Sequence, residues 1–252
     1  MTATFTDLAG AHVFITGGGS GIGAALTEAF LRQGSKVSFV GRGDYADFAA
    51  KMGDKTGDTP LFIKCDVTDT TALHAAMDRA VAEQGPLRVQ VNNAATDTRM
   101  APADITVQDW DDQIAINLRH YFFACQKAAA LMGKGGSIIN FSSASYQIAG
   151  DKLAPYIASN AGIIGLTRAL ARDFGPTGIR VNAISPGLVL TKKQIEEVHT
   201  EEDLAAFRER QCLPENLYPG DVPGTALFLA SDLSRMMTAQ CLFIDGGLAF
   251  TG

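Results

Sequence analysis

Cysteine, positive charge and long apolar runs are all scarce in this chain of 252 residues. Acidic residues outnumber basic ones and give a formal charge of −6, which indicates neither a nucleic-acid nor an anionic-membrane partner. No apolar run approaches the roughly 20 residues that a membrane span needs. The cysteines are scattered without a CxxC pair, so neither a metal site nor a disulfide framework is predicted: Cys65, Cys125, Cys212 and Cys241.

The N-terminal segment also lacks the marks of a secretory signal. Met1–Thr6 is short, polar and without charged side chains. Free thiols are then expected in a reducing compartment. These absences together predict a cytoplasmic protein.

Apolar residues and glycine are plentiful, at 46% and 26 residues, as in a well-buried core with many tight turns. Short β-branched runs alternate with amphipathic helical stretches. The runs are nearly all apolar rather than alternating, as expected for strands covered on both faces. We predict one α/β domain over residues 1–252, a Rossmann-like, doubly wound parallel sheet of about seven strands with helices on both faces. The predicted strands are Val13–Thr16, Lys36–Val40, Leu61–Lys64, Val89–Asn92, Ser137–Phe141, Arg180–Ile184 and Cys241–Ile244.

One region interrupts this alternation. Charged helical fragments fill residues 188–219, between Pro186-Gly187 and Pro219-Gly220. An insertion after the carboxyl end of a strand lies over the ligand crevice of an open α/β sheet. The region is therefore predicted to be a substrate lid, with a plain surface excursion as the alternative.

A glycine-rich turn follows the first predicted strand, where Thr16–Gly23 reads TGGGSGIG. Gly17 permits the tight turn, Gly21 lets backbone amides approach a phosphate, and Gly23 lets the next helix pack on the strand. The N-terminus of that helix adds a positive dipole. This arrangement predicts a site for the pyrophosphate of a dinucleotide.

Further motifs occur at spacings that match one family. Asn92-Asn93-Ala94-Ala95 ends the fourth predicted strand, Ser143 precedes Tyr156 by thirteen residues, and Pro186-Gly187 with Thr191 follows the sixth strand. With the glycine-rich turn, they make the whole chain resemble the classical short-chain dehydrogenase/reductase family. The resemblance implies hydride transfer with NAD(P) and a homotetramer formed through two long helices, here near Trp110–Leu131 and Tyr156–Phe174.

The resemblance also implies roles for individual residues. Ser143 would hold the reacting oxygen of the substrate, Tyr156 would exchange its proton, and Asn117 would serve a proton relay. Each residue also has a purely structural alternative: Ser143 as a turn residue, Tyr156 as a packed aromatic ring, and Asn117 as a polar helix residue that binds water. Tyr146 is a weaker candidate for the proton donor. The implied cofactor contacts are Gly17, Ser20, Gly21, Ile22, Gly23, Arg42, Asp66, Val67, Asn93, Ala94, Tyr156, Asn160, Pro186, Gly187, Val189 and Thr191.

The chain departs from the family at one catalytic position. The family has a lysine four residues after the tyrosine, whereas this chain has Asn160. Asn160 can hydrogen-bond the nicotinamide ribose but carries no charge to stabilise a tyrosinate. The oxidised nicotinamide and an acidic substrate hydroxyl, such as the anomeric hydroxyl of an aldose, would make up part of that loss.

A second resemblance concerns the substrate. Thr96–Arg99, Asn117–His120 and Gln211–Leu213 are similar to segments of bacterial aldose 1-dehydrogenases of this family, which oxidise sugars to lactones. Asp97 and Arg99 would then bind sugar hydroxyls. An exposed ion pair is the alternative, and Arg99 with Lys192 and Lys193 could instead receive a sugar acid or a sulfonate.

Cofactor choice depends on the end of the second predicted strand. Gly41 stands where NAD-specific relatives tend to place an aspartate, and Arg42 follows it. We therefore predict a preference for NADP, although NAD remains possible. Asp66 is either an adenine contact or part of a helix start.

Three hypotheses of function remain at this point. The first is an aldose 1-dehydrogenase, and the second is a carbonyl or oxoacyl reductase of another substrate class. The third is a catalytically weak nucleotide-binding protein, which Asn160 alone suggests.

Overall fold

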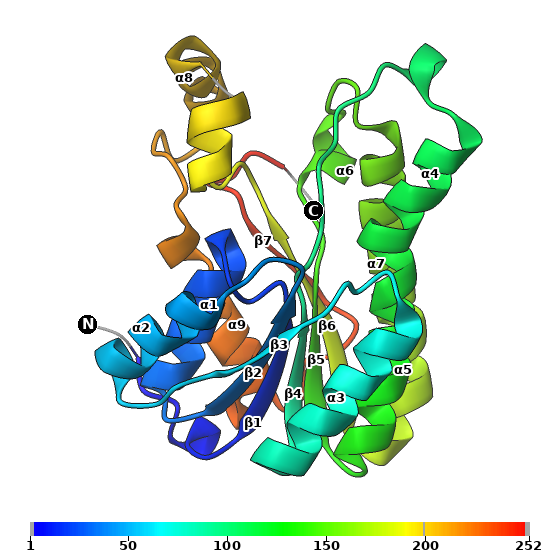
Figure 1. The fold of residues 1–252 in the computed structure, drawn as a ribbon. Coiled ribbons are helices and arrows are strands. Elements are labelled where there is room, and N and C mark those ends of the chain that lie inside the picture. Colours follow the sequence, from blue (N-terminus) through cyan, green and yellow to red (C-terminus); the bar gives the residue numbers. More distant parts are fainter. Residues whose placement is uncertain (1–2, 199, 250–252) are drawn as a thin grey trace.

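Seven parallel strands form a single sheet in the computed structural model, which describes residues 3–198 and 200–249. The strand order is β3-β2-β1-β4-β5-β6-β7 (Figure 1). Every predicted strand is present, which confirms the predicted fold, and most of them extend slightly beyond their predicted bounds. The strands are β1 (His12–Thr16), β2 (Lys36–Gly41), β3 (Leu61–Lys64), β4 (Leu87–Asn92), β5 (Gly136–Phe141), β6 (Ile179–Pro186) and β7 (Cys241–Ile244).

Helices cover both faces of the sheet, and each face has its own apolar core (Figure 1). On one face pack α1 (Gly21–Arg32), α2 (Ala46–Thr56) and α9 (Pro223–Ala230). On the other pack α3 (Thr70–Gln84), α5 (His120–Met132) and α7 (Ala154–Phe174), while α4 (Val107–Ile114) packs against α7. Because both faces are covered, β1 and β5 are buried at every position, which explains why their residues do not alternate between apolar and polar.

The chain changes direction across the sheet between β3 and β4. It runs outward through β1, β2 and β3 and then returns to place β4 beside β1, with Thr16 opposite Asn92. The carboxyl ends of β1 and β4 therefore diverge into loops on opposite faces. Such a switch point leaves a crevice at that edge of the sheet.

The long helix predicted near Trp110–Leu131 is present over residues 107–132, but it is not α-helical throughout. A π-helical segment, Ala115–Arg119, separates α4 from α5. The extra residue of a π-turn leaves the apolar spacing on either side intact, so the periodicity gave no sign of it. Single π-turns inside α-helices occur frequently at functional sites.

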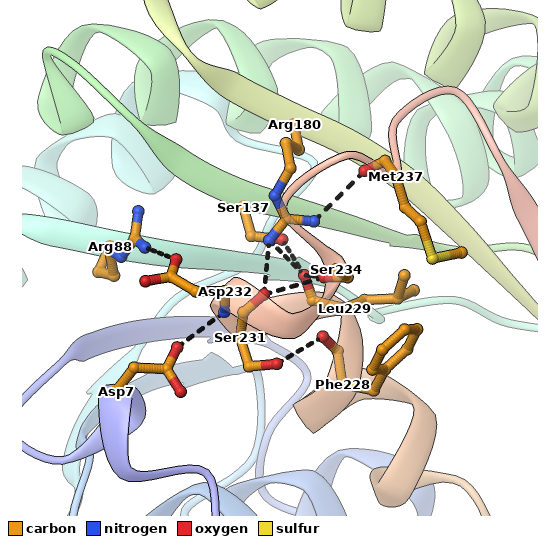
Figure 2. Close-up of polar contacts among 10 residues, drawn as sticks. All are labelled: Asp7, Arg88, Ser137, Arg180, Phe228, Leu229, Ser231, Asp232, Ser234 and Met237. Atoms are coloured by element: carbon orange, nitrogen blue, oxygen red, sulfur yellow. Dashed lines mark hydrogen bonds and ion pairs between the residues drawn. The ribbon is translucent and has the colours of Figure 1, made fainter.

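At the amino ends of the strands, opposite the crevice, polar contacts join the sheet to the end of α9 (Figure 2). The Arg180 guanidinium donates to the carbonyls of Leu229 and Ser231, at 2.7 and 3.2 Å, where α9 ends. Arg88 forms an ion pair with Asp232, whose amide donates to Asp7. A cation at a helix C-terminus both satisfies free carbonyls and complements the helix dipole.

No helix in the described ranges is long and apolar enough to cross a membrane. Within the same ranges, no cluster of three or more potential metal ligands is found.

Candidate functional site

The glycine-rich turn packs so closely that side chains do not fit. A Cβ at Gly23 would overlap the carbonyl oxygen of Gly17, and one at Gly17 would lie 3.0 Å from the Cα of Ala94. Gly17 and Gly21 adopt φ of +71° and +52°, the left-handed region that favours glycine. The Asn93 amide fastens the turn by donating to the Gly17 carbonyl at 3.2 Å.

The start of α1 is left open to a ligand. Its N-cap, Ser20, makes no side-chain capping hydrogen bond, so the first amides of the helix keep their donors free. Free amides, the helix dipole and a cradle without side chains suit a pyrophosphate. The residues of this turn therefore fit the dinucleotide that the sequence predicts.

A cavity of about 270 Å³ opens beside this turn, at the switch point of the sheet. Residues predicted for cofactor, substrate and catalysis meet in its wall. These are Ile22, Asn93, Asp97, Arg99, Ser143, Tyr156, Asn160, Pro186, Gly187, Val189 and Thr191. Asn117, Lys193, Arg42, Asp66, Val67, Gly17, Ser20, Gly21, Gly23 and Ala94 do not line it.

Tyr156 lies in the first turn of α7, across from Ser143 in the loop after β5. Burial raises the pKa of the Tyr156 phenol above its ordinary value, and the negative charge of Asp97 raises it further. Hydrogen bonding from Ser143 and Asn160 lowers the pKa by less. Without a ligand, Tyr156 therefore keeps its phenolic proton to a higher pH than an ordinary tyrosine does.

Asn160, one turn further along α7, is 3% exposed and lines the same cavity. Its side-chain amide donates to the backbone carbonyl of Tyr156 at 2.8 Å. The backbone carbonyl of Asn160 accepts from the Ser142 hydroxyl at 3.0 Å. Asn160 thus fixes the start of α7, and its predicted contact with a ribose stays a prediction.

Asn117 lies in the π-helical segment, behind the cavity wall, and is 1% exposed. Its side-chain oxygen accepts from the Thr96 amide at 2.8 Å, and its side-chain amide donates to Gln113. Asn117 therefore holds the loop that follows β4 against the helix. Its part in a proton relay stays a prediction.

The predicted lid reaches the cavity through Asp97. Lys193 and Gln194 donate to the two Asp97 carboxylate oxygens at 3.0 and 2.8 Å. These contacts outweigh the effect of burial and lower the pKa of Asp97, so the carboxylate is charged at neutral pH. Arg99 stands in the same wall, exposed.

The rest of this region covers the cavity from above. It contains a π-turn, Gln194–Val198, and the helix α8 (Glu201–Glu209), at the top of Figure 1. Phe207 of α8 lines the cavity, as Gln194 does, and neither was predicted as a site residue. Residue 199 of the predicted lid lies outside the described residues.

Tyr45 is a further residue that the sequence did not single out. Its ring covers the carboxyl end of β2, where a Cβ at Gly41 would lie 2.7 Å from the ring. The ring also packs edge-on against Phe62, with centroids 5.7 Å apart. A carboxylate at position 41 would therefore displace Tyr45. Arg42 beside it is exposed.

Asp66 has a local role in the loop after β3. Its carboxylate accepts from the amide and hydroxyl of Thr68 at 2.9 and 2.8 Å. The N-cap of α3 is Asp69, which accepts from the Ala72 amide. Asp66 is thus a turn residue beside the helix start rather than the cap itself.

Comparisons with known proteins agree with this geometry. A family model described as enoyl-(acyl carrier protein) reductase matches residues 17–249. A "probable galactose dehydrogenase" of Rhizobium meliloti is 48% identical, and a D-xylose 1-dehydrogenase of Caulobacter vibrioides is 42% identical; each alignment covers 98% of both chains. The solved aldohexose dehydrogenase of Thermoplasma acidophilum has a TM-score of 0.87 at 29% identity, over 97% of this chain and 96% of its own.

The chain therefore belongs to the short-chain dehydrogenase/reductase family, whose members are NAD(P)-dependent oxidoreductases.

Proposed function

We propose that this protein oxidises the anomeric hydroxyl of an aldose to the lactone, with NAD(P) as hydride acceptor. The observation that carries the proposal is the 48% identity, along 98% of the chain, to a "probable galactose dehydrogenase". The polar part of the cavity wall supports it: Asp97 and Gln194 line the cavity, Lys193 holds Asp97 from outside it, and carboxylate and amide groups can bind several hydroxyls of one sugar. A sugar acid or sulfonate is accommodated by the exposed Arg99 beside this wall.

Two side chains would carry out the chemistry, and two more would position them. Ser143 orients the reacting oxygen, and Tyr156 takes its proton. Asn160 fixes Tyr156 through the start of α7, and Asn117 fixes the facing loop. The bound nicotinamide supplies the hydride acceptor. Because the pKa of Tyr156 is raised, a substrate hydroxyl more acidic than a simple alcohol suits this site.

For the cofactor, we propose a preference for NADP over NAD. NAD-specific relatives tend to place at position 41 an aspartate that repels a 2′-phosphate, whereas here Tyr45 occupies the space that such a side chain would need. Arg42 beside it is exposed and can face the phosphate. Calorimetric binding of both oxidised cofactors tests this preference, and tighter binding of NAD would reject it.

The experiment for the activity is a panel of neutral and acidic aldoses with either cofactor, followed by nicotinamide absorbance and by detection of the lactone. Tyr156→Phe is the control and should abolish turnover. Turnover of a ketone or an oxoacyl thioester but of no sugar would favour a carbonyl reductase.

A second candidate is a catalytically weak nucleotide-binding protein. It is favoured by Asn160 in place of the lysine and by the raised pKa of Tyr156. Cofactor binding without turnover at any pH would establish it.

We also propose a cytoplasmic homotetramer. An apolar groove between α5 and α7, on the two helices that the family resemblance implicates, supports the assembly. Its lining includes Leu118, Phe122 and Leu166.

A further inference from the structure

Tyr121 carries a hydroxyl that nothing in the fold accounts for. The residue is the second of α5 and has no exposed surface. Its hydroxyl makes no hydrogen bond with any residue in the described ranges. A buried hydroxyl without a partner destabilises a fold, so its presence calls for an explanation other than packing.

The surroundings of Tyr121 fix its ring in one place. The ring contacts that of His120, with centroids 4.5 Å apart. One turn further along α5, the thiol of Cys125 is held by the side-chain amide of Asn92 at 3.2 Å. Tyr121 itself lines the cavity together with Tyr156 and Asn160. Tyr121 is therefore a fixed residue at the cavity that also holds Tyr156 and Asn160.

Tyr121 also stays neutral while Tyr156 ionises. Burial raises the pKa of Tyr121 well above its ordinary value, and the charge of an ionised Tyr156 raises it further. The Tyr121 hydroxyl is thus available as a hydrogen-bond donor at any pH at which Tyr156 acts as a base. A donor that stays neutral beside a phenolate favours the charged form of that phenolate.

We propose that Tyr121 is a positioning residue for proton transfer: its hydroxyl donates a hydrogen bond toward the phenolate oxygen of Tyr156 and, with Asn160, takes over part of the role of the absent lysine. Such bonds strengthen as charge develops, and those in a free enzyme are frequently long and tighten only during reaction. An unpartnered hydroxyl in the resting site is consistent with that behaviour. The inference rests on the proposed function only in taking Tyr156 as the base.

The first test needs no substrate. The protein is labelled with ¹³C at the ζ carbon of its five tyrosines, and their resonances are followed against pH with and without NAD⁺. The Tyr156 resonance is assigned with Tyr156→Phe. In Tyr121→Phe, the titration of Tyr156 should move to higher pH. An unchanged Tyr156 titration would overturn the proposal, whether or not a sugar is ever oxidised.

The second test is the pH profile of kcat/KM for the best substrate of the panel. Because the base must be deprotonated, a higher pKa moves the acidic limb to higher pH. We expect Tyr121→Phe to lower kcat/KM at neutral pH about tenfold, to approach the wild-type rate at high pH, and to raise Tm because the unpartnered hydroxyl is gone. An equal loss at every pH together with a lower Tm would indicate a merely structural role.

Tyr146→Phe is the matched control. It also removes one phenolic hydroxyl, but its ring faces Phe243, with centroids 6.0 Å apart, and it does not line the cavity. Its acidic limb should coincide with that of the wild type. An equal displacement in both variants would refute a specific role for Tyr121.

Discussion

At the scale of single residues, the role proposed for Tyr156 requires it to release a proton in surroundings that raise its pKa. Burial and the charge of Asp97 raise the pKa of its phenol, and hydrogen bonding from Ser143 and Asn160 offsets this rise only in part. An ammonium at position 160 would act in the opposite direction to Asp97. The identity of residue 160 therefore decides at which pH this site can work.

Asn160→Lys should move the acidic limb of the sugar-oxidation profile to lower pH. A unit charge about 4 Å away at an effective dielectric near 20 is worth on the order of 4 kcal/mol, part of which is lost in burying the ammonium. We expect kcat/KM at neutral pH to rise at least about tenfold. The measurement is a pH series of initial rates with sugar and oxidised cofactor.

Asn160→Met provides the control for this change. It matches the length of the lysine stem but adds no charge, and it removes the bond to the Tyr156 carbonyl. The methionine variant should not move the acidic limb of the pH profile to lower pH. Equal profiles for the two variants would show that charge at this position is irrelevant.

His120 links folding stability to pH. The side chain is 1% exposed, and burial lowers the pKa of His120 to about 3. In the unfolded chain it titrates near 6.5, so on acidification the unfolded state binds a proton before the native state does. Between pH 7 and pH 5 this group should reduce the free energy of unfolding by about 2 kcal/mol. Urea denaturation at pH 7 and pH 5 should show a smaller fall in the free energy of unfolding for His120→Asn than for the wild type. An identical fall in the two proteins would show that His120 does not cause this pH dependence.

Some residues of the site could be predicted from the sequence and others could not. Ser143 and Tyr156 could be paired from the sequence because their spacing is a family motif. Tyr45 and Gln194 could not be identified in this way, because each acts through space. Tyr45 fills the place of a side chain that Gly41 lacks, and Gln194 reaches Asp97 across 97 positions of sequence.

At the scale of elements, burial on both faces made the strands predictable and left their ends uncertain. The apolar run predicts β6 over Arg180–Ile184, yet the strand spans Ile179–Pro186, because sheet pairing with β7 continues through Ser185 and Pro186. The π-turn before α5 could not be predicted from the sequence for a different reason. Its Asn117 accepts a hydrogen bond from the Thr96 amide, and hydrophobic periodicity within one helix carries no information on such a contact with another segment.

Arg180→Met tests whether a side chain from β6 secures the end of α9 (Figure 2). The variant leaves the carbonyls of Leu229 and Ser231 without this donor, and hydrogen bonds to a charged group are worth about 1.5–3 kcal/mol. The free energy of unfolding in urea should fall by about 2 kcal/mol. Arg88→Met is the control, since its exposed ion pair with Asp232 is worth under about 1 kcal/mol. Equal losses in the two variants would refute the capping role.

At the scale of the whole molecule, apolar side chains remain on the surface. The groove between α5 and α7 is lined by Leu118, Phe122 and Leu166, and Phe122 is 39% exposed. Val107 and Trp110 of α4 are also exposed, at 80% and 42%. Apolar surface of this kind marks an interface more often than open solvent.

Gly165→Arg tests whether a second copy covers this groove. Gly165 belongs to the groove wall in α7, and a Cβ there would meet nothing within 4 Å, so an arginine fits the single chain. Arginine also favours a helix more than glycine does, which preserves the fold. In an assembly, however, the new charge would be buried against the facing helices. Light scattering after size exclusion should show the wild type as a tetramer and the variant as smaller species with an unchanged circular dichroism spectrum. Gly175→Arg, where a Cβ likewise meets nothing within 4 Å just beyond the end of α7, should remain tetrameric. A Gly165→Arg variant of wild-type mass would exclude this face from the assembly.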